Sequence, residues 1–287
     1  MNRIFLFGLT NIAVLVVLSI VIRLTGLDSQ VNINGLLIIA LIFGMGGSFV
    51  SLLLSKPMAI KSMRCQVIKD PASSTERWLM QTIQKLARGA EMGVPDVAIF
   101  PSSDMNAFAT GADRNHALVA VSSGLLHSMT EDEIEAVLGH EITHIANGDM
   151  VTMTLLQGVL NTFVIFFSRI VGSVVDRAVF RNERGTGIGY FITVIAAQIV
   201  FGLLASIIVM WFSRQREFRA DAGSASLLGT TNPMIAALRR LGANSPQADL
   251  PDAIEVAGIY GTKGLNLSRL FMSHPPLEER IAALQQG

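Results

Sequence analysis

Four stretches of this chain contain no charged residue, and each is long enough to form a helix that crosses a lipid bilayer. A transmembrane helix needs about 20 mostly apolar residues to cross roughly 30 Å of hydrocarbon. Charged residues make up only 15% of the 287 residues, whereas soluble domains contain about 25%. We therefore expect a mainly α-helical integral membrane protein. The charge-free windows are residues 4–22, 29–55, 150–168 and 185–213.

These windows do not all carry the same weight. Residues 4–22 are longer than the apolar region of a signal peptide and lack a small-x-small cleavage site, so we interpret them as a retained anchor. Residues 29–55 contain GMGGS, a run of small residues that suits close helix packing. The third and fourth windows contain LLQGVLNTF and VIAAQIVFG, whose amide side chains could line a site. The sequence leaves open whether these two windows cross the membrane completely.

The region between the second and third windows predicts a small soluble fold. Ser73 and Glu76 form a capping-box pattern at the start of one helix, and Thr130 and Glu133 form another. Between these helices, short runs rich in β-branched and apolar residues predict strands at 96–100, 106–111 and 116–122. After the fourth window the chain is again helical in pattern. We expect a membrane anchor of two helices at 1–55, a hydrophobic helical pair at 150–213, and a soluble part in two pieces, 56–149 and 214–287.

Charge and cysteine content exclude some classes of protein. The formal net charge is zero, which argues against a nucleic acid as partner. Cys65 is the only cysteine, so the chain can form no disulfide within itself.

The segment HEITH places two histidines four residues apart, with a glutamate directly after the first. On a helix, His140 and His144 lie on one face and can offer imidazole nitrogens to one ion, as Zn²⁺ requires. Glu141 is rotated by roughly 100° from that face. This position keeps it off the metal but lets it take a proton from an attacking water. The pattern therefore indicates a zinc hydrolase.

A catalytic zinc needs a third protein ligand and an open position. The metzincin pattern fails, because it requires glycine at 147 and histidine at 150, where the chain has Asn147 and Met150. A carboxylate candidate stands in EFRAD, where Glu217 and Asp221 are four residues apart. Glu217 would bind the metal, and Asp221 would accept a hydrogen bond from the outer nitrogen of a metal-binding histidine. The other candidates that remain are His116, His127 and His274.

Together these motifs resemble the gluzincin family that contains the CAAX prenyl proteases. The resemblance rests on MNAFATG at 105–111, VAVSSGLL at 119–126, LGHEITHIANGD at 138–149, EFRAD at 217–221 and SHPPLEERIAAL at 273–284. It extends from about residue 75 to the C-terminus, in the expected order. The apolar pair of segments at the N-terminus favours the bacterial heat-shock branch over the longer prenyl-protease branch. The resemblance implies a zincin-like (gluzincin) catalytic domain with a small β-sheet, together with transmembrane helices.

The resemblance also implies a role for each matching residue. His140, His144 and Glu217 correspond to the ligands of one zinc ion per chain, and Glu141 corresponds to the general base. Asp221 matches the carboxylate behind a ligand histidine. His274 matches a histidine that supports the tetrahedral intermediate, with Arg280 near the same site. The expected substrate-binding strand, which pairs with the substrate backbone, comprises Asn106, Ala107, Phe108, Ala109 and Thr110.

The function we expect is that of a zinc-dependent endopeptidase. The resemblance implies that its substrates are misfolded or damaged membrane proteins, or other unfolded polypeptides. His144 precedes Val151 by seven residues and Glu217 follows Phe212 by five, so each lies within roughly 10 Å of an apolar segment. We expect the site at the membrane surface. The alternatives are a CAAX-type processing protease with one defined substrate, and a non-catalytic membrane scaffold or transporter.

The distribution of Lys and Arg predicts the orientation in the bacterial inner membrane. Residues 24–34 contain neither, whereas four basic residues follow the second window: Lys56, Lys61, Arg64 and Lys69. The positive-inside rule then places the catalytic helix in the cytoplasm. Arg177, Arg181 and Arg184 disagree, because four complete spans would place them outside. The oligomeric state stays open.

Overall fold

The computed structural model describes residues 33–181, 187–244, 272 and 274–286. The expected anchor at 4–22 lies outside the described residues. The chain divides into two compact units. The helical unit comprises residues 1–51 and 151–209, and the mixed unit comprises residues 52–150 and 210–287.

The second, third and fourth charge-free windows form long helices. The second window contains α2 (Ile33–Leu41), a π-helical turn, η2 (Ile42–Gly46), and most of α3 (Gly47–Ser62). The third becomes α7 (Asp149–Ala178), and the fourth becomes the first part of α8 (Ile188–Leu228). Three helical segments of the described chain are long and apolar enough to cross a membrane: Gly35–Ser62, Asp149–Ala178 and Ile188–Leu228. The protein is therefore a membrane protein.

In the helical unit, a close contact between helices depends on a glycine. A Cβ atom at Gly44 would lie 2.6 Å from the backbone nitrogen of Thr162. Real Cβ atoms essentially never come so near to backbone, so only glycine lets η2 and α7 pack at this distance. On α8, large apolar side chains such as Ile195, Ile199 and Leu203 are more than half exposed, which suits contact with lipid.

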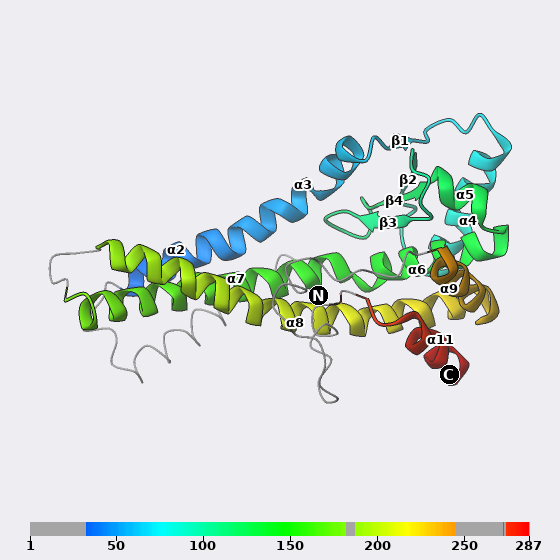
Figure 1. The fold of residues 1–287 in the computed structure, drawn as a ribbon. Coiled ribbons are helices and arrows are strands. Elements are labelled where there is room, and N and C mark those ends of the chain that lie inside the picture. Colours follow the sequence, from blue (N-terminus) through cyan, green and yellow to red (C-terminus); the bar gives the residue numbers. More distant parts are fainter. Residues whose placement is uncertain (1–32, 182–186, 245–271, 273, 287) are drawn as a thin grey trace. The chain divides into compact units, whose positions relative to one another are not determined.

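A four-stranded sheet is the centre of the mixed unit (Figure 1). Its strands are β1 (Gln66–Val67), β2 (Asp96–Phe100), β3 (Ala107–Thr110) and β4 (Leu118–Ser122), in the order β1-β2-β4-β3. Strands β2 and β4 are parallel, whereas β3 pairs with β4 antiparallel, with Phe108 opposite Ala120. The three expected strands are present, with ends shifted by up to two residues. Strand β1 was not expected, because a two-residue strand has no visible alternation.

Three helices of the mixed unit pack against this sheet: α4 (Ser74–Gly89), α5 (Ser123–Ser128) and α6 (Glu131–Asn147). A second apolar cluster joins α6 to the end of α8, to α9 (Asn232–Asn244) and to α11 (Leu277–Gln286). Both predicted capping boxes form, at Ser73 with Glu76 and at Thr130 with Glu133. The core contains Leu79, Ile83 and Leu86 of α4, Val119 and Val121 of β4, and Leu138, Ile142 and Ile145 of α6. This packing fixes the rotation of α6 about its own axis.

Helices α6 and α8 approach each other closely in the mixed unit. The hydroxyl of Ser224 donates to the carbonyl oxygen of Ala136 at 2.6 Å. A Cβ at Gly139 would lie 2.8 Å from Ser224 Oγ, and one at Gly223 would lie 2.7 Å from Thr143 Oγ1. Small residues on both helices therefore allow this approach, which places HEITH beside EFRAD.

Candidate metal centre

Helix α6 brings the two histidines of HEITH together, as their spacing predicts. The Nε2 atoms of His140 and His144 are 3.0 Å apart, and the rings meet edge to face. Both residues are buried, at 7% and 9% exposure. The opposite face of α6 lies in the hydrophobic core, which holds the two rings toward α8.

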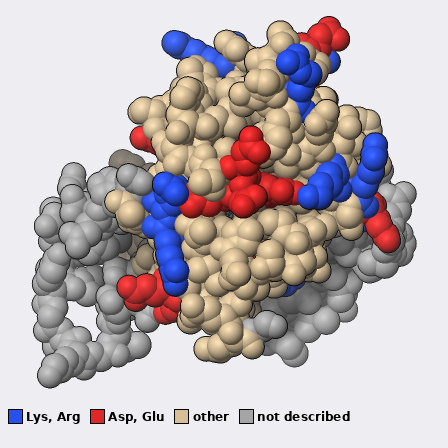
Figure 2. Space-filling view, turned by 90° about the vertical axis from the view of Figure 1, so that its right-hand side faces the viewer, with Lys and Arg blue, Asp and Glu red and all other residues tan. Residues whose placement is uncertain are grey.

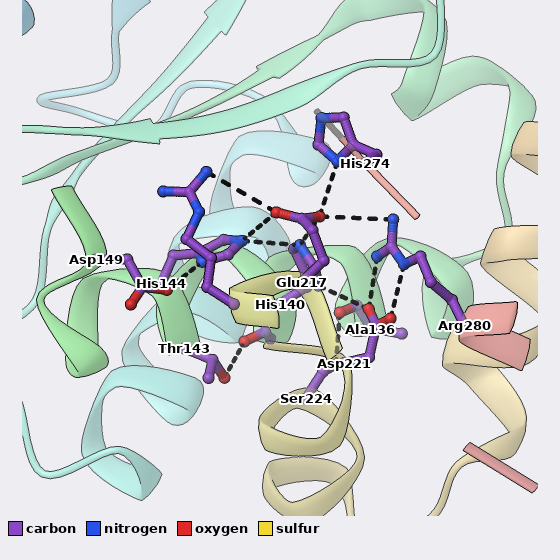
Figure 3. A network of polar contacts seen from close by, with 12 residues as sticks. Ala136, His140, Thr143, His144, Asp149, Glu217, Asp221, Ser224, His274 and Arg280 are labelled. Carbon is purple, nitrogen blue, oxygen red and sulfur yellow. Dashed lines mark hydrogen bonds and ion pairs between the residues drawn. The ribbon is translucent and has the colours of Figure 1, made fainter. Parts of the chain in front are cut away.

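Helix α8 supplies the third group of the cluster. The Glu217 carboxylate lies 3.5 Å from His140 Nε2 and 3.4 Å from His144 Nε2, and the residue is 1% exposed. Figure 3 shows the three side chains pointing toward one another. Their ligand atoms all lie within 4.8 Å of one another, and among the described residues only these three form such a group. His116 and His127 bond instead to Asp113 and to the Ser123 carbonyl, which leaves them outside this group.

Two carboxylates hold the outer nitrogens of the histidines. His140 Nδ1 is 2.9 Å from Asp221 Oδ1, and His144 Nδ1 is 2.6 Å from Asp149 Oδ2. Each Nδ1 therefore donates its proton to a carboxylate, and Nε2 is the nitrogen that each ring presents to the other. At 3.0 Å, two Nε2 lone pairs would repel each other unless a proton or a cation lay between them.

The cluster fits a zinc ion by its own chemistry. Glu217 Oε1 is buried and has no hydrogen-bond partner among the described residues, so an acceptor is left unsatisfied beside the two Nε2 atoms. Two imidazole nitrogens and a carboxylate are the donor set of many catalytic zinc sites. The outer carboxylates are also typical of zinc-binding histidines, because they fix the tautomer and orientation of the ring.

Asp149 is a part of this arrangement that the sequence did not reveal. It stands five residues after His144, across Gly148, which ends α6 in the left-handed conformation with a φ of 70°. Asp149 is 2% exposed and begins α7. An acidic residue at a helix start is ordinarily explained by the helix dipole. The only signal for another role was its distance of five residues from a candidate ligand.

Arg280 binds Asp221, the carboxylate behind His140. Its Nε and Nη2 atoms donate to Asp221 Oδ2 and Oδ1 at 2.7 and 2.6 Å, and its Nη1 lies 3.6 Å from Glu217 Oε2. The side chain is only 8% exposed. We expected Arg280 near the substrate, and the structure places its guanidinium beside the metal cluster, with two donors occupied by Asp221.

The carboxylates change the proton affinity of both histidines. Burial lowers the pKa of His140, but hydrogen bonds from its ring to Asp221 and Glu217 raise it, and the pKa reaches about 9. The pKa of His144 is also raised, because bonds to Asp149 and Glu217 outweigh burial. A metal ion has to displace these protons when it binds.

Glu141 and His274 lie at the more open side of the cluster. Glu141 is partly exposed, and in the part of the chain that the structure describes it makes no hydrogen bond or ion pair. It is therefore available as a proton acceptor. His274 Nδ1 is 2.9 Å from Glu217 Oε2, and its side chain is 62% exposed (Figure 3). Arg214 holds the neighbouring backbone by donating to the Met272 carbonyl at 2.8 Å.

The expected substrate strand is an edge of the sheet. Residues Ala107–Thr110 pair with β4 on one side only, and β3 is the last strand in the sheet order. Asn106 continues this pairing, because its backbone oxygen accepts from the Ser122 amide at 2.9 Å. The backbone of β3 thus has one side without a strand partner in the described sheet.

Charges on the surface show no dominant sign on the face drawn in Figure 2. Acidic side chains gather near its middle between basic ones, and uncharged side chains cover most of the rest. This agrees with the net charge of zero and gives no basic stripe on this face for nucleic acid to bind.

Comparisons with known proteins match this chain to a family of peptidases and to proteases. Residues 73–287 match peptidase family M48. The chain is 58% identical over 292 residues to Protease HtpX of Thioalkalivibrio sulfidiphilus, with 99% of both chains covered. It is 59% identical over 294 residues to the Protease HtpX homolog of Nitrosomonas eutropha, with both chains fully covered. In structure it is similar to the crystal structure of S. mikatae Ste24p, with a TM-score of 0.56 and 21% identity over 93% of this chain and 66% of that chain.

Proposed function

Because this chain belongs to peptidase family M48 and is a zinc metalloprotease of the membrane, we propose that it cleaves misfolded or damaged membrane proteins and other unfolded polypeptides. One observation carries the proposal for the site: two histidine Nε2 atoms and a glutamate carboxylate converge, while a carboxylate holds each outer nitrogen. The resemblance to the heat-shock branch of the family supports the class of substrate.

In this proposal, His140, His144 and Glu217 hold one zinc ion. When bound, zinc acts as a Lewis acid that makes water a nucleophile near neutral pH and polarises the scissile carbonyl. Asp221 and Asp149 keep the two rings in the tautomer that presents Nε2. Arg280 in turn fixes Asp221 through two charge-assisted hydrogen bonds.

Glu141 moves the proton in both halves of the reaction. Its carboxylate, one position beyond His140, has no competing hydrogen bond in the described structure. It accepts a proton from the attacking water as the water adds to the peptide carbon. It then gives this proton to the nitrogen of the leaving amine, and the C–N bond breaks.

His274 donates a hydrogen bond to the substrate's carbonyl oxygen as negative charge develops there. Its side chain is mostly exposed and its Nδ1 bonds to Glu217, so Nε2 is the nitrogen left to donate to a substrate. A donor that is in place before charge develops stabilises the transition state without further reorganisation. This geometry supports the donor role over direct metal binding, because His274 is not a member of the metal-binding group.

The substrate lies as an added strand along β3. The unpaired side of Asn106–Thr110 offers main-chain donors and acceptors that are independent of sequence. Such binding suits an enzyme that takes many unfolded chains. We propose that the remaining contacts in this strand, from Phe108 and its neighbours, adjust affinity only.

The location we propose is the bacterial inner membrane, with the mixed unit in the cytoplasm. Lys56, Lys61, Arg64 and Lys69 follow the second apolar window and support this orientation by the positive-inside rule. Protease accessibility in inverted and right-side-out vesicles tests it, since only inverted vesicles should expose the mixed unit.

A single preparation tests the main proposal. The purified protein should contain one zinc per chain and degrade unfolded casein, and chelation should abolish both properties until zinc is restored. Glu141→Gln should keep the zinc and lose proteolysis, because the ligands remain while the proton acceptor is gone. Near-normal turnover by this variant would show that another group is the base. Cleavage of casein at only one site would favour a processing enzyme with a defined substrate.

A further inference from the structure

Arg216 has hydrogen-bond donors that nothing in the described structure uses. Its side chain is only 20% exposed, and its Nε is buried without a partner. Within the described residues, its one close ionic contact is from Nη2 to Glu217 Oε1 at 3.9 Å, which is beyond hydrogen-bond distance. A guanidinium carries five N–H donors in a rigid plane, and a mostly buried cation without hydrogen bonds is costly. These donors therefore call for an acceptor.

The two oxygens of Glu217 show on which side of the metal cluster this arginine lies. Oε2 is near His274 and Arg280, at 2.9 and 3.6 Å. Oε1 is near His144 and Arg216, at 3.4 and 3.9 Å. Arg280 is bound to Asp221, whereas Arg216 has no such partner among the residues that the structure describes. The cluster thus has a cationic group with free donors on the side away from His274.

We propose that Arg216 binds an oxygen acceptor of the substrate next to the scissile bond, on the His144 side of the metal centre. The proposal rests on the peptidase function proposed above. The ligand chemistry is a planar oxygen acceptor, for which the fork of a guanidinium is suited. Two groups of a peptide supply it: the carbonyl of the neighbouring peptide unit, or a terminal carboxylate where the chain ends close to the cleaved bond.

A purely electrostatic role for Arg216 makes a different prediction. If Arg216 only balanced the charge of Glu217, a lysine would serve equally, and its loss would change zinc binding. If it binds substrate oxygens, zinc binding stays constant while substrate affinity falls. Lysine should then restore little, because its single ammonium lacks the planar fork.

The experiment compares Arg216→Gln and Arg216→Lys with Arg219→Gln. Arg219 is exposed on the same helix, three residues further on, so its variant removes the same charge as a matched control. Each is placed in the zinc-loaded Glu141→Gln background, and peptide binding is measured by fluorescence anisotropy, with zinc content measured in parallel. We expect Arg216→Gln to weaken peptide binding about 10- to 150-fold, as for a lost hydrogen bond to a charged group. Arg219→Gln should leave it unchanged.

Two peptides that differ only in their last group separate the two sources of oxygen. One ends in a carboxylate two residues past the cleaved bond, and the other ends in a carboxamide. An equal loss for both in Arg216→Gln assigns the main-chain carbonyl, and a loss confined to the first assigns the carboxylate. Either result supports the proposal.

Three results would overturn it: loss of zinc in Arg216→Gln, full binding by Arg216→Lys, or peptide affinity in Arg216→Gln equal to that of the control. These differ from a failure of the peptidase function itself. In that case the unsubstituted protein would cleave neither peptide, and the Glu141→Gln protein would bind neither.

Discussion

Gly223→Ala should weaken zinc binding although residue 223 is not one of the three residues that form the metal cluster. The added Cβ would lie 2.7 Å from Thr143 Oγ1, 3.0 Å from Thr143 Cβ and closer still to Thr143 Cγ2. Thr143 is β-branched and lies directly before His144, so it cannot rotate freely out of the way. Gly223 lies two residues after Asp221. The methyl group therefore pushes α6 and α8 apart where the metal-binding residues face each other.

The magnitude follows from overpacking. An extra methyl group in a filled contact destabilises the folded protein by about 1–3 kcal/mol. Replacing glycine by alanine inside a helix stabilises the helix by about 1 kcal/mol. Gly202→Ala separates the two effects, because Gly202 is on the same helix and a Cβ there would meet nothing within 4 Å. If the strain is relieved only by moving the metal-binding residues apart, Gly223→Ala should bind zinc about 5- to 150-fold more weakly than Gly202→Ala.

The assay is competition for zinc with a chromophoric chelator in detergent micelles. Adding Thr143→Ala to Gly223→Ala should recover part of the affinity, since it removes the two nearest atoms, Cγ2 and Oγ1, and keeps the 3.0 Å contact to Cβ. If Gly223→Ala bound zinc as tightly as Gly202→Ala, the close approach of the helices would not be what positions the ligands.

Three further predictions concern single side chains. Asp149→Asn should weaken zinc binding by about 10–100-fold, as for other carboxylates behind ligand histidines, and an unchanged zinc affinity in the same competition assay would refute its role. His274→Ala should lower turnover about 10²–10³-fold while metal analysis still finds one zinc per chain, and loss of the metal would make His274 a ligand. Burial raises the pKa of Glu133, but bonds to Arg240 and to the Thr130 amide lower it overall. Its stabilisation is therefore present above the unfolded pKa of about 4.3 and is lost as pH falls through the folded value. Glu133→Gln should lower the thermal midpoint at neutral pH, and its difference from the unsubstituted protein should shrink in acid.

The sequence predicts the parts of this protein that depend on local patterns. The second, third and fourth charge-free windows became long helices, both capping boxes formed, and HEITH and EFRAD met at one cluster. A helix fixes which residues share a face, so spacing alone relates His140 to His144. EFRAD could be proposed as the second half of the site because few pairs of acidic residues in this chain are four residues apart, as Glu217 and Asp221 are.

What the sequence missed depends on contacts that no local pattern encodes. Asp149 reaches His144 across Gly148, whose left-handed conformation ends α6, and a glycine in the sequence does not specify where the next side chain will lie. In the sequence, Arg216 is one of several basic residues that follow an apolar window. Only its surroundings in the structure show that some of its hydrogen-bond donors are unused. The π-helical turn Ile42–Gly46 likewise has no distinct sequence pattern.

The order of the metal-binding residues along the chain has a consequence during biosynthesis. Glu217 follows His144 by 73 residues (217 − 144), and α7 and most of α8 lie between them. At about 5–20 residues per second, a ribosome needs roughly 4–15 s to synthesise that interval. Throughout it, the emerging polypeptide has two of the three proposed zinc ligands and lacks Glu217. On this assignment, a nascent protease stays inactive beside its own unfolded segments until the end of α8 that carries Glu217 has been made.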